Sequence, residues 1–115
     1  MDDVTHQFRL SRTDLVEFIA SETKQREFAE DVAYANYAYE FYEWWFGDWH
    51  PESPLFRKAF TSKEIEILEG FTKTWQKFDA ELGENLTIDD LLANTTWAQI
   101  MGQAKLTLSA LNNAT

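Results

Sequence analysis

The spacing of the large apolar residues constrains the fold of this chain more than any other feature. Between residues 28 and 46 they recur at intervals of four and three, at Phe28, Val32, Ala35, Tyr39, Tyr42 and Phe46. These intervals keep all of them on one face of an α-helix for about five turns. The sequence therefore predicts a long helix over about 25–46, with this stripe in the core and Gly47 as the left-handed residue that ends it.

Helix-capping residues mark where the other predicted helices begin. A Ser or Thr followed three residues later by an acid or Gln resembles a capping box, and Ser before Pro is a favoured start of a helix. These signals occur at Ser11 with Asp14 (a short helix, about 12–23), Ser53 with Pro54 (a short helix), Thr61 with Glu64 (a helix over about 62–82 that Gly83 ends), Thr87 with Asp90 (a short helix) and Thr96 with Gln99 (the last helix). Gly102 in the last helix is expected to permit a close contact with a neighbouring helix.

Few residues in the chain favour turns, which decides the fold class. The 115 residues include four Gly and two Pro, and 44% of them are hydrophobic, enough for one sizeable core. Residues 1–10 show no apolar period and are expected to form an extended or flexible arm. The sequence therefore predicts one all-α domain over 1–115, an irregular bundle of about three long and two or three short helices.

The net charge of −10 excludes several classes of partner. Twenty acidic against ten basic residues repel nucleic-acid phosphates and anionic lipids, so we expect no direct contact with nucleic acid or membrane. The same field attracts a basic protein. The chain has no cysteine, no signal-like N-terminus and no apolar segment long enough to span a membrane, which predicts a cytoplasmic protein.

The negative charge is most concentrated in residues 27–56, which hold seven carboxylates and no Lys or Arg. On the predicted helix, Tyr37 and Trp44 lie about 160–180° away from the apolar stripe. Two interpretations follow: these rings pack under another helix, or they are exposed anchors ringed by carboxylates. A homodimer through the two rings is a further alternative. The exposed interpretation predicts a partner-binding surface made of Glu30, Tyr37, Glu40, Trp44, Asp48, Trp49 and Glu52.

Few groups of residues in the sequence have the types and spacing of a catalytic site. In the loop 48–54, alternation along an extended segment would turn Asp48, His50 and Glu52 the same way, as a metal-dependent enzyme would need. Glu40 and Glu43 lie three residues apart on a helix, but the His that accompanies such pairs in di-iron bundles is missing. No nucleophile, phosphate-binding or dinucleotide motif is present. We therefore expect no enzyme, cofactor or metal, and the metal-binding loop is the alternative.

The segment 27–56 combines acidic and aromatic side chains in six residues: Glu30, Tyr37, Glu40, Trp44, Asp48 and Trp49. With the small size, the negative charge and the absence of cysteine, the whole chain resembles the small acidic helical immunity proteins of bacterial toxin systems, of the contact-dependent-inhibition or colicin type. The resemblance implies tight binding to a basic, nuclease-like toxin domain, with its active site or an adjacent exosite blocked. The alternative is a nucleic-acid mimic, which would present carboxylates in place of phosphates over one long surface.

Overall fold

The computed structural model describes residues 2–34, 36–83 and 86–114, and the regular structure in these ranges is entirely helical. The predicted all-α fold is therefore confirmed. The helices are α1 (Asp3–Ala20), α2 (Glu22–Asp31), α3 (Tyr37–Phe46), α4 (Pro54–Ala59), α5 (Ser62–Asp79), α6 (Ile88–Ala93) and α7 (Thr95–Asn113). None of these helices is long and apolar enough to cross a membrane.

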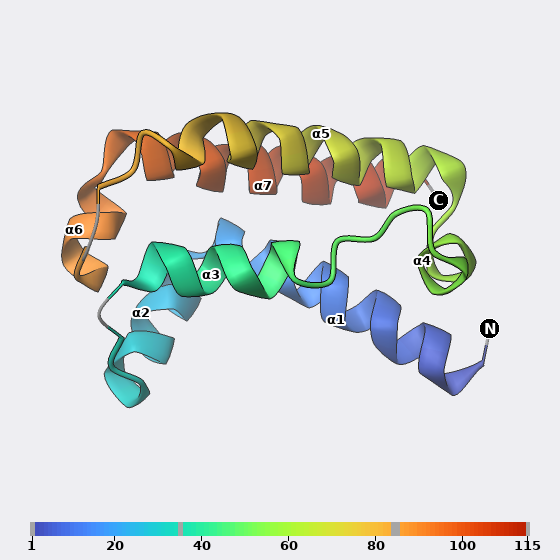
Figure 1. Ribbon diagram of the computed structural model, residues 1–115, viewed down its shortest axis with the longest axis horizontal. Helices are drawn as coiled ribbons and strands as arrows, with labels where there is room; N and C mark the ends of the chain where they lie inside the picture. The colour runs from blue at the N-terminus through green and yellow to red at the C-terminus, as the bar shows by residue number, and fades with distance from the viewer. Residues whose placement is uncertain (1, 35, 84–85, 115) are drawn as a thin grey trace.

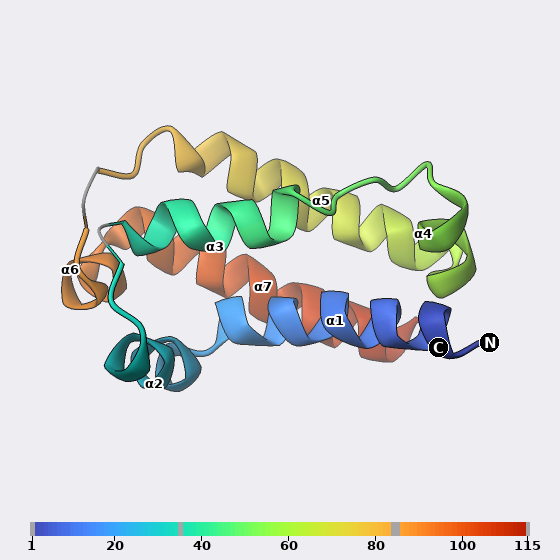
Figure 2. The ribbon, with the colours of Figure 1, turned by 60° about the horizontal axis from the view of Figure 1, so that its bottom comes forward.

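Four helices run along the long axis of the molecule, and each is antiparallel to the next in the chain (Figures 1 and 2). They are α1, α3, α5 and α7, and α7 lies beside both α5 and α1. The short helices occupy the connections: α4 closes one end, near both termini, and α2 and α6 close the other. The molecule is thus an up-and-down bundle whose short helices cap its ends without breaking the alternation.

The core of the bundle is built from aromatic side chains. Trp45 of α3, Trp75 of α5 and Trp97 of α7 are all fully buried. The rings of Trp75 and Trp97 meet edge to face with centroids 5.8 Å apart, and the Trp45 indole nitrogen donates a 2.9 Å hydrogen bond to the Thr72 hydroxyl. Bulky rings between α3 and α5 hold these helices together through side chains, because each ring buries a large apolar area.

The first helix corrects the prediction for the N-terminal segment. Residues 3–10 belong to α1, and the Asp2 carboxylate caps this helix by accepting a 2.8 Å hydrogen bond from the Thr5 amide. Ser11 lies inside α1 and caps nothing. The buried face of α1 includes Thr5 and Arg12 as well as Val16 and Ile19. Because Thr5 and Arg12 are polar, the spacing of apolar residues did not indicate a helix there.

The predicted helix over 25–46 is wrong, because the chain leaves the helical conformation after Asp31 and α3 begins anew at Tyr37. The Asn36 side chain caps α3 by accepting a 3.1 Å hydrogen bond from the Tyr39 amide. The interruption changes the rotational phase of α3, so Tyr39 is 57% exposed, whereas Phe41 and Trp45 are fully buried. Of the predicted stripe, Ala35 lies outside the described residues.

Some of the other predicted helix ends are confirmed and some are wrong. The caps at Ser53, at Thr87 and at Thr61 with Glu64 are confirmed. The last helix begins earlier than predicted, since the Asn94 side chain accepts a 3.0 Å hydrogen bond from the Trp97 amide in place of a Thr96 cap. Gly47 ends α3 as predicted, but it is right-handed (φ −60°) and not left-handed. The other two glycine predictions are wrong: α5 ends before Gly83, and a Cβ at Gly102 would meet no atom within 4 Å.

A buried arginine joins the first helix to the end of the third. The Arg12 guanidinium donates 2.9 Å hydrogen bonds to the main-chain oxygens of Trp44 and Trp45 and lies 4.9 Å from the Trp45 ring. The last carbonyls of a helix lack partners within it and carry partial negative charge, so a cation there is stabilising. Arg12 therefore supplies the positive charge that residues 27–56 lack.

Candidate binding site: a groove between α3 and the end of α5

Two of the predicted anchors lie against the core. Tyr37 is 7% exposed, and its hydroxyl donates a 2.8 Å hydrogen bond to the Val32 carbonyl oxygen. Trp44 is half-buried, with its ring 5.6 Å from Phe18 and 5.0 Å from Phe28. The interpretation that these rings pack under neighbouring helices is the one the structure favours. Tyr37 offers too little surface for an exposed anchor or for a homodimer through the two rings.

The remaining predicted residues are spread over different parts of the surface. Asp48 is exposed and lies 3.6 Å from the Arg12 guanidinium, in a shallow hollow that Trp44 also lines. Trp49 is half-buried and stacks on Trp45 with centroids 5.6 Å apart. Three carboxylates complete the set: Glu30 is exposed on α2, Glu40 half-buried on α3, and Glu52 exposed in the loop before α4. The seven residues therefore do not form one continuous surface.

The loop after α3 does not form the metal site considered as an alternative. Within the described residues, no three His, Cys, Asp or Glu side chains come close enough to hold a metal ion. The loop is turned and not extended: the Trp49 amide donates to the Phe46 carbonyl oxygen, and the Ser53 amide to that of His50. Alternation of side chains applies to an extended strand. The expectation that Asp48, His50 and Glu52 point the same way is therefore wrong.

The surface that α3 does present to solvent is shifted from the predicted one. Tyr37 and Tyr39 point about 200° apart on a helix, so burying the first exposes the second. Tyr39 is 57% exposed and Glu43 is exposed. The aromatic and acidic character predicted for this helix is thus retained, but on Tyr39 and Glu43 in place of Tyr37 and Trp44.

Beside this face lies a groove of about 410 Å³ between α3 and the segment that ends α5. One wall carries Tyr39, Tyr42 and Glu43, and the opposite wall carries Asp79. The Tyr42 ring stacks on Phe46 with centroids 4.0 Å apart, which fixes its position. The remaining lining residues are small or apolar: Ala38, Ala80, Leu82 and Gly83, with Asn36 at one end.

Asp79 is in an electrostatically unfavourable position. It is half-buried at the last residue of α5, where the helix dipole already places negative charge. Among the described residues no cation forms an ion pair with it, and the nearby Lys77 ammonium lies over the Phe78 ring, 5.5 Å from its centroid. Burial raises the pKa of the Asp79 carboxyl above its ordinary value. A cation bound beside Asp79 would stabilise its charged form.

Negative charge also reaches the phenol that lines the groove. Burial raises the pKa of Tyr42, and the charges of Asp79 and Glu43 raise it further. The two carboxylates therefore act on the same small region from opposite walls. A groove with carboxylates, phenol rings and a helix C-terminus is electrostatically favourable to a cation and unfavourable to an anion.

A signal in the sequence could have pointed to this second wall. Residues 78–104 lack Lys and Arg, as residues 27–56 do. The fold brings parts of both segments together where α6 contacts α2 and α3, at the end of the bundle where α5 also ends (Figure 1). Eight carboxylates at or near this end make no ion pair within the described part of the chain: Glu27, Glu30, Asp31, Glu40, Glu43, Asp79, Glu81 and Asp90.

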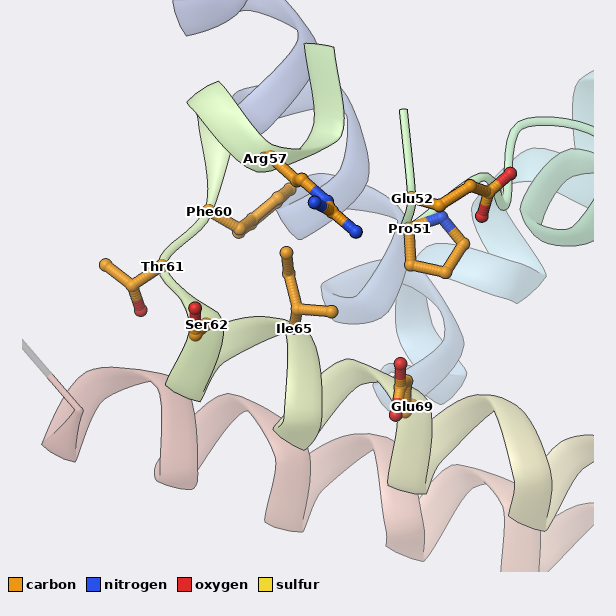
Figure 3. Close-up of a pocket in the computed structure, with 8 residues that line it drawn as sticks. All are labelled: Pro51, Glu52, Arg57, Phe60, Thr61, Ser62, Ile65 and Glu69. Atoms are coloured by element: carbon orange, nitrogen blue, oxygen red, sulfur yellow. The ribbon is translucent and has the colours of Figure 1, made fainter. Parts of the chain in front are cut away.

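A larger groove, of about 770 Å³, lies at the opposite end between α4 and the start of α5. Figure 3 shows Arg57 pointing into the space beside Pro51 and Ile65, with Glu69 below it and the Glu52 carboxylate turned away. Its opposite charges do not select a ligand of one sign. The α3–α5 groove has the clearer chemical preference. No protein-family model, curated protein or solved structure matches the chain.

Proposed function

We propose that this protein binds a basic protein and inhibits it, as an immunity protein neutralises a nuclease-like toxin. The observation that carries the proposal is the acidic end of the bundle, where two segments without Lys or Arg, 27–56 and 78–104, come together. Arg26 of α2 pairs with Glu22 and with Asp89 of α6 at this end, and the remaining carboxylates leave negative charge in excess. A predominantly negative surface raises the rate of encounter with a partner of opposite sign and disfavours other partners.

The α3–α5 groove supports the same proposal at shorter range. Tyr39 is an exposed aromatic residue among carboxylates, and aromatic residues carry much of the binding energy at protein interfaces. Asp79 carries a charge in a position that destabilises the free protein. A partner that brings a cation to this carboxylate would relieve that repulsion. Removing this unfavourable interaction of the free protein would add to the affinity for the partner.

The test begins with affinity capture from the lysate of the source organism at low and at high ionic strength. The captured protein is identified and purified, and its own activity is measured against increasing amounts of this protein. The proposal expects a basic partner, weaker capture at high salt because the charges are screened, and inhibition that is complete at one equivalent. A captured protein that is acidic or keeps its activity at saturation contradicts the proposal, as does the absence of capture at either salt concentration.

Nucleic-acid mimicry predicts a different result in the same assay. A mimic spreads its recognition over many carboxylates, so inhibition would decline gradually as Glu27, Glu30 and Asp31 are neutralised one by one. An anchored interface would instead lose most of its affinity when Tyr39 alone is changed to Ala. The second pattern is the one that the proposal expects.

A further inference from the structure

The groove between α3 and the end of α5 has the chemistry of a receptor for a cationic side chain, and ample room for one. Its volume is about 410 Å³, and both of its carboxylates, Glu43 and Asp79, are without an ion pair among the described residues. Asp79 is also half-buried. Removing a carboxylate from water is unfavourable unless a cation or hydrogen-bond donors replace the water.

We propose that this groove is the receptor for one arginine side chain of the basic partner. The proposal names a specific contact and rests on the proposed function. The planar guanidinium has five donors and can bind a carboxylate in a bidentate manner, whereas an ammonium acts as a point charge. Asp79 is the primary acceptor and Glu43 approaches the cation from the other wall. The rings of Tyr39 and Tyr42 provide faces on which a guanidinium stacks.

Charge complementarity favours this occupant over the others. A second copy of this chain carries a net charge of −10 and would be repelled. An apolar side chain would cover Asp79 without pairing it, which buries an uncompensated charge. A phosphate or carboxylate ligand would place a third anion beside the two carboxylates.

The experiment uses two small probes, Nα-acetyl-arginine methylamide and its uncharged analogue Nα-acetyl-citrulline methylamide. The probes are titrated into the isotopically labelled protein, and the amide resonances are followed by NMR. The proposal expects saturable shifts at Tyr39, Glu43, Ala80 and Gly83 with the arginine probe. The dissociation constant of the citrulline probe should be at least about tenfold higher. Shifts that spread over α2 and α6 without saturating, or equal affinity for both probes, would overturn it.

Matched variants show whether the binding depends on position or on net charge. Asp79→Asn and Glu66→Gln each remove one negative charge from α5, but Glu66 is exposed and does not line the groove. The arginine probe should bind about tenfold more weakly to Asp79→Asn and with unchanged affinity to Glu66→Gln. Equal affinities for the two variants would overturn the proposal. Asp79→Asn keeps the size of the side chain, and its amide spectrum without the probe shows whether it keeps the wild-type fold.

The outcomes separate this proposal from the proposed function. If the captured partner is inhibited equally well by the wild type and by Asp79→Asn, the groove proposal fails and the inhibitory function stands. If the arginine probe occupies the groove but no basic partner is inhibited, the inhibitory function fails and the groove remains a guanidinium site.

Discussion

Glu43 on α3 and Asp79 at the end of α5 line the same groove from opposite walls, and neither forms an ion pair within the described residues. Functional sites can retain features that reduce stability, because selection acts only on the stability that function requires. The two carboxylates lie thirty-six positions apart in the chain and line the same groove because α3 and α5 are neighbours in the bundle.

Asp79→Asn should stabilise the free protein. The substitution removes a negative charge from the C-terminus of a helix, a change worth about 0.5 kcal/mol in the free energy of unfolding. Because burial raises the folded pKa of Asp79, the benefit should exist at neutral pH and disappear as the pH falls below that pKa and the wild-type carboxyl becomes neutral. Urea unfolding at several pH values measures this, with Glu66→Gln as control. A less stable Asp79→Asn at pH 7 would contradict the electrostatic account.

Arg12→Ala should destabilise the bundle strongly. The buried guanidinium is the donor to the Trp44 and Trp45 carbonyl oxygens, and its removal leaves both unpaired and opens a void beside the Trp45 ring. We expect a loss of about 3 kcal/mol, measured by urea unfolding. Arg57→Ala removes the same charge from an exposed site and should change stability by less than about 0.5 kcal/mol. Similar losses for both variants would show that Arg12 matters only through net charge.

Acidic pH should lower the free energy of unfolding, because Glu64 becomes protonated. This buried carboxylate accepts two hydrogen bonds from the Arg9 guanidinium, at 2.7 and 2.9 Å, and one from the Thr61 amide, and the Arg9 bonds are the main reason that its pKa is lowered from the ordinary 4.5. A lowered folded pKa contributes stability above pH 4.5, and this contribution is lost as the pH falls through the folded value.

The measurement is the unfolding free energy of the wild type and Glu64→Gln between neutral and acidic pH. The variant should be less stable by about 2 kcal/mol at pH 7, and the difference should narrow in acid. If the difference is the same at every pH, the Arg9–Glu64 pair is not the source of the acid sensitivity.

Gly70→Ala and Gly102→Ala should each stabilise the protein by about 1 kcal/mol. Both glycines lie within helices, where Gly is less favourable than Ala, and a Cβ at either position would meet no atom within 4 Å. Gly47→Ala is the contrasting variant, because its Cβ would lie 2.7 Å from the Glu43 carbonyl oxygen. Thermal unfolding should rank Gly47→Ala below the wild type and the other two above it. A destabilised Gly102→Ala would contradict the free space beside Gly102.

Local signals in the sequence predicted those parts of the fold that depend on local interactions. The capping box of Thr61 with Glu64 and the cap at Ser53 before Pro54 lie within a few residues of the bonds they make, and both are present in the structure. The helix containing Arg12 was missed over its first half because its buried face includes polar residues. Arg12 is buried only because the end of α3 provides carbonyl acceptors, and no local pattern reveals that partner.

The candidate site was predicted in character but not in position. The acidic aromatic segment does face a groove, but the helix break before Asn36 rotated the exposed face from Tyr37 to Tyr39. Asn within an apolar period is a poor helix former and a good N-cap, so this break had a local signal. The absence of Lys and Arg from 78–104 marks the segment that contains Asp79 as acidic, but no local pattern shows that this residue faces Glu43 across a groove.

The most direct test of the account is the dissociation constant of the purified basic partner for two double variants of equal net charge. Glu43→Gln with Asp79→Asn neutralises the groove, whereas Asp3→Asn with Glu66→Gln neutralises two exposed carboxylates toward the opposite end. We predict that the groove variant binds about a hundredfold more weakly than the wild type and the control variant less than about threefold more weakly. Equal weakening by both would mean that only net charge matters and would contradict a binding site in the α3–α5 groove.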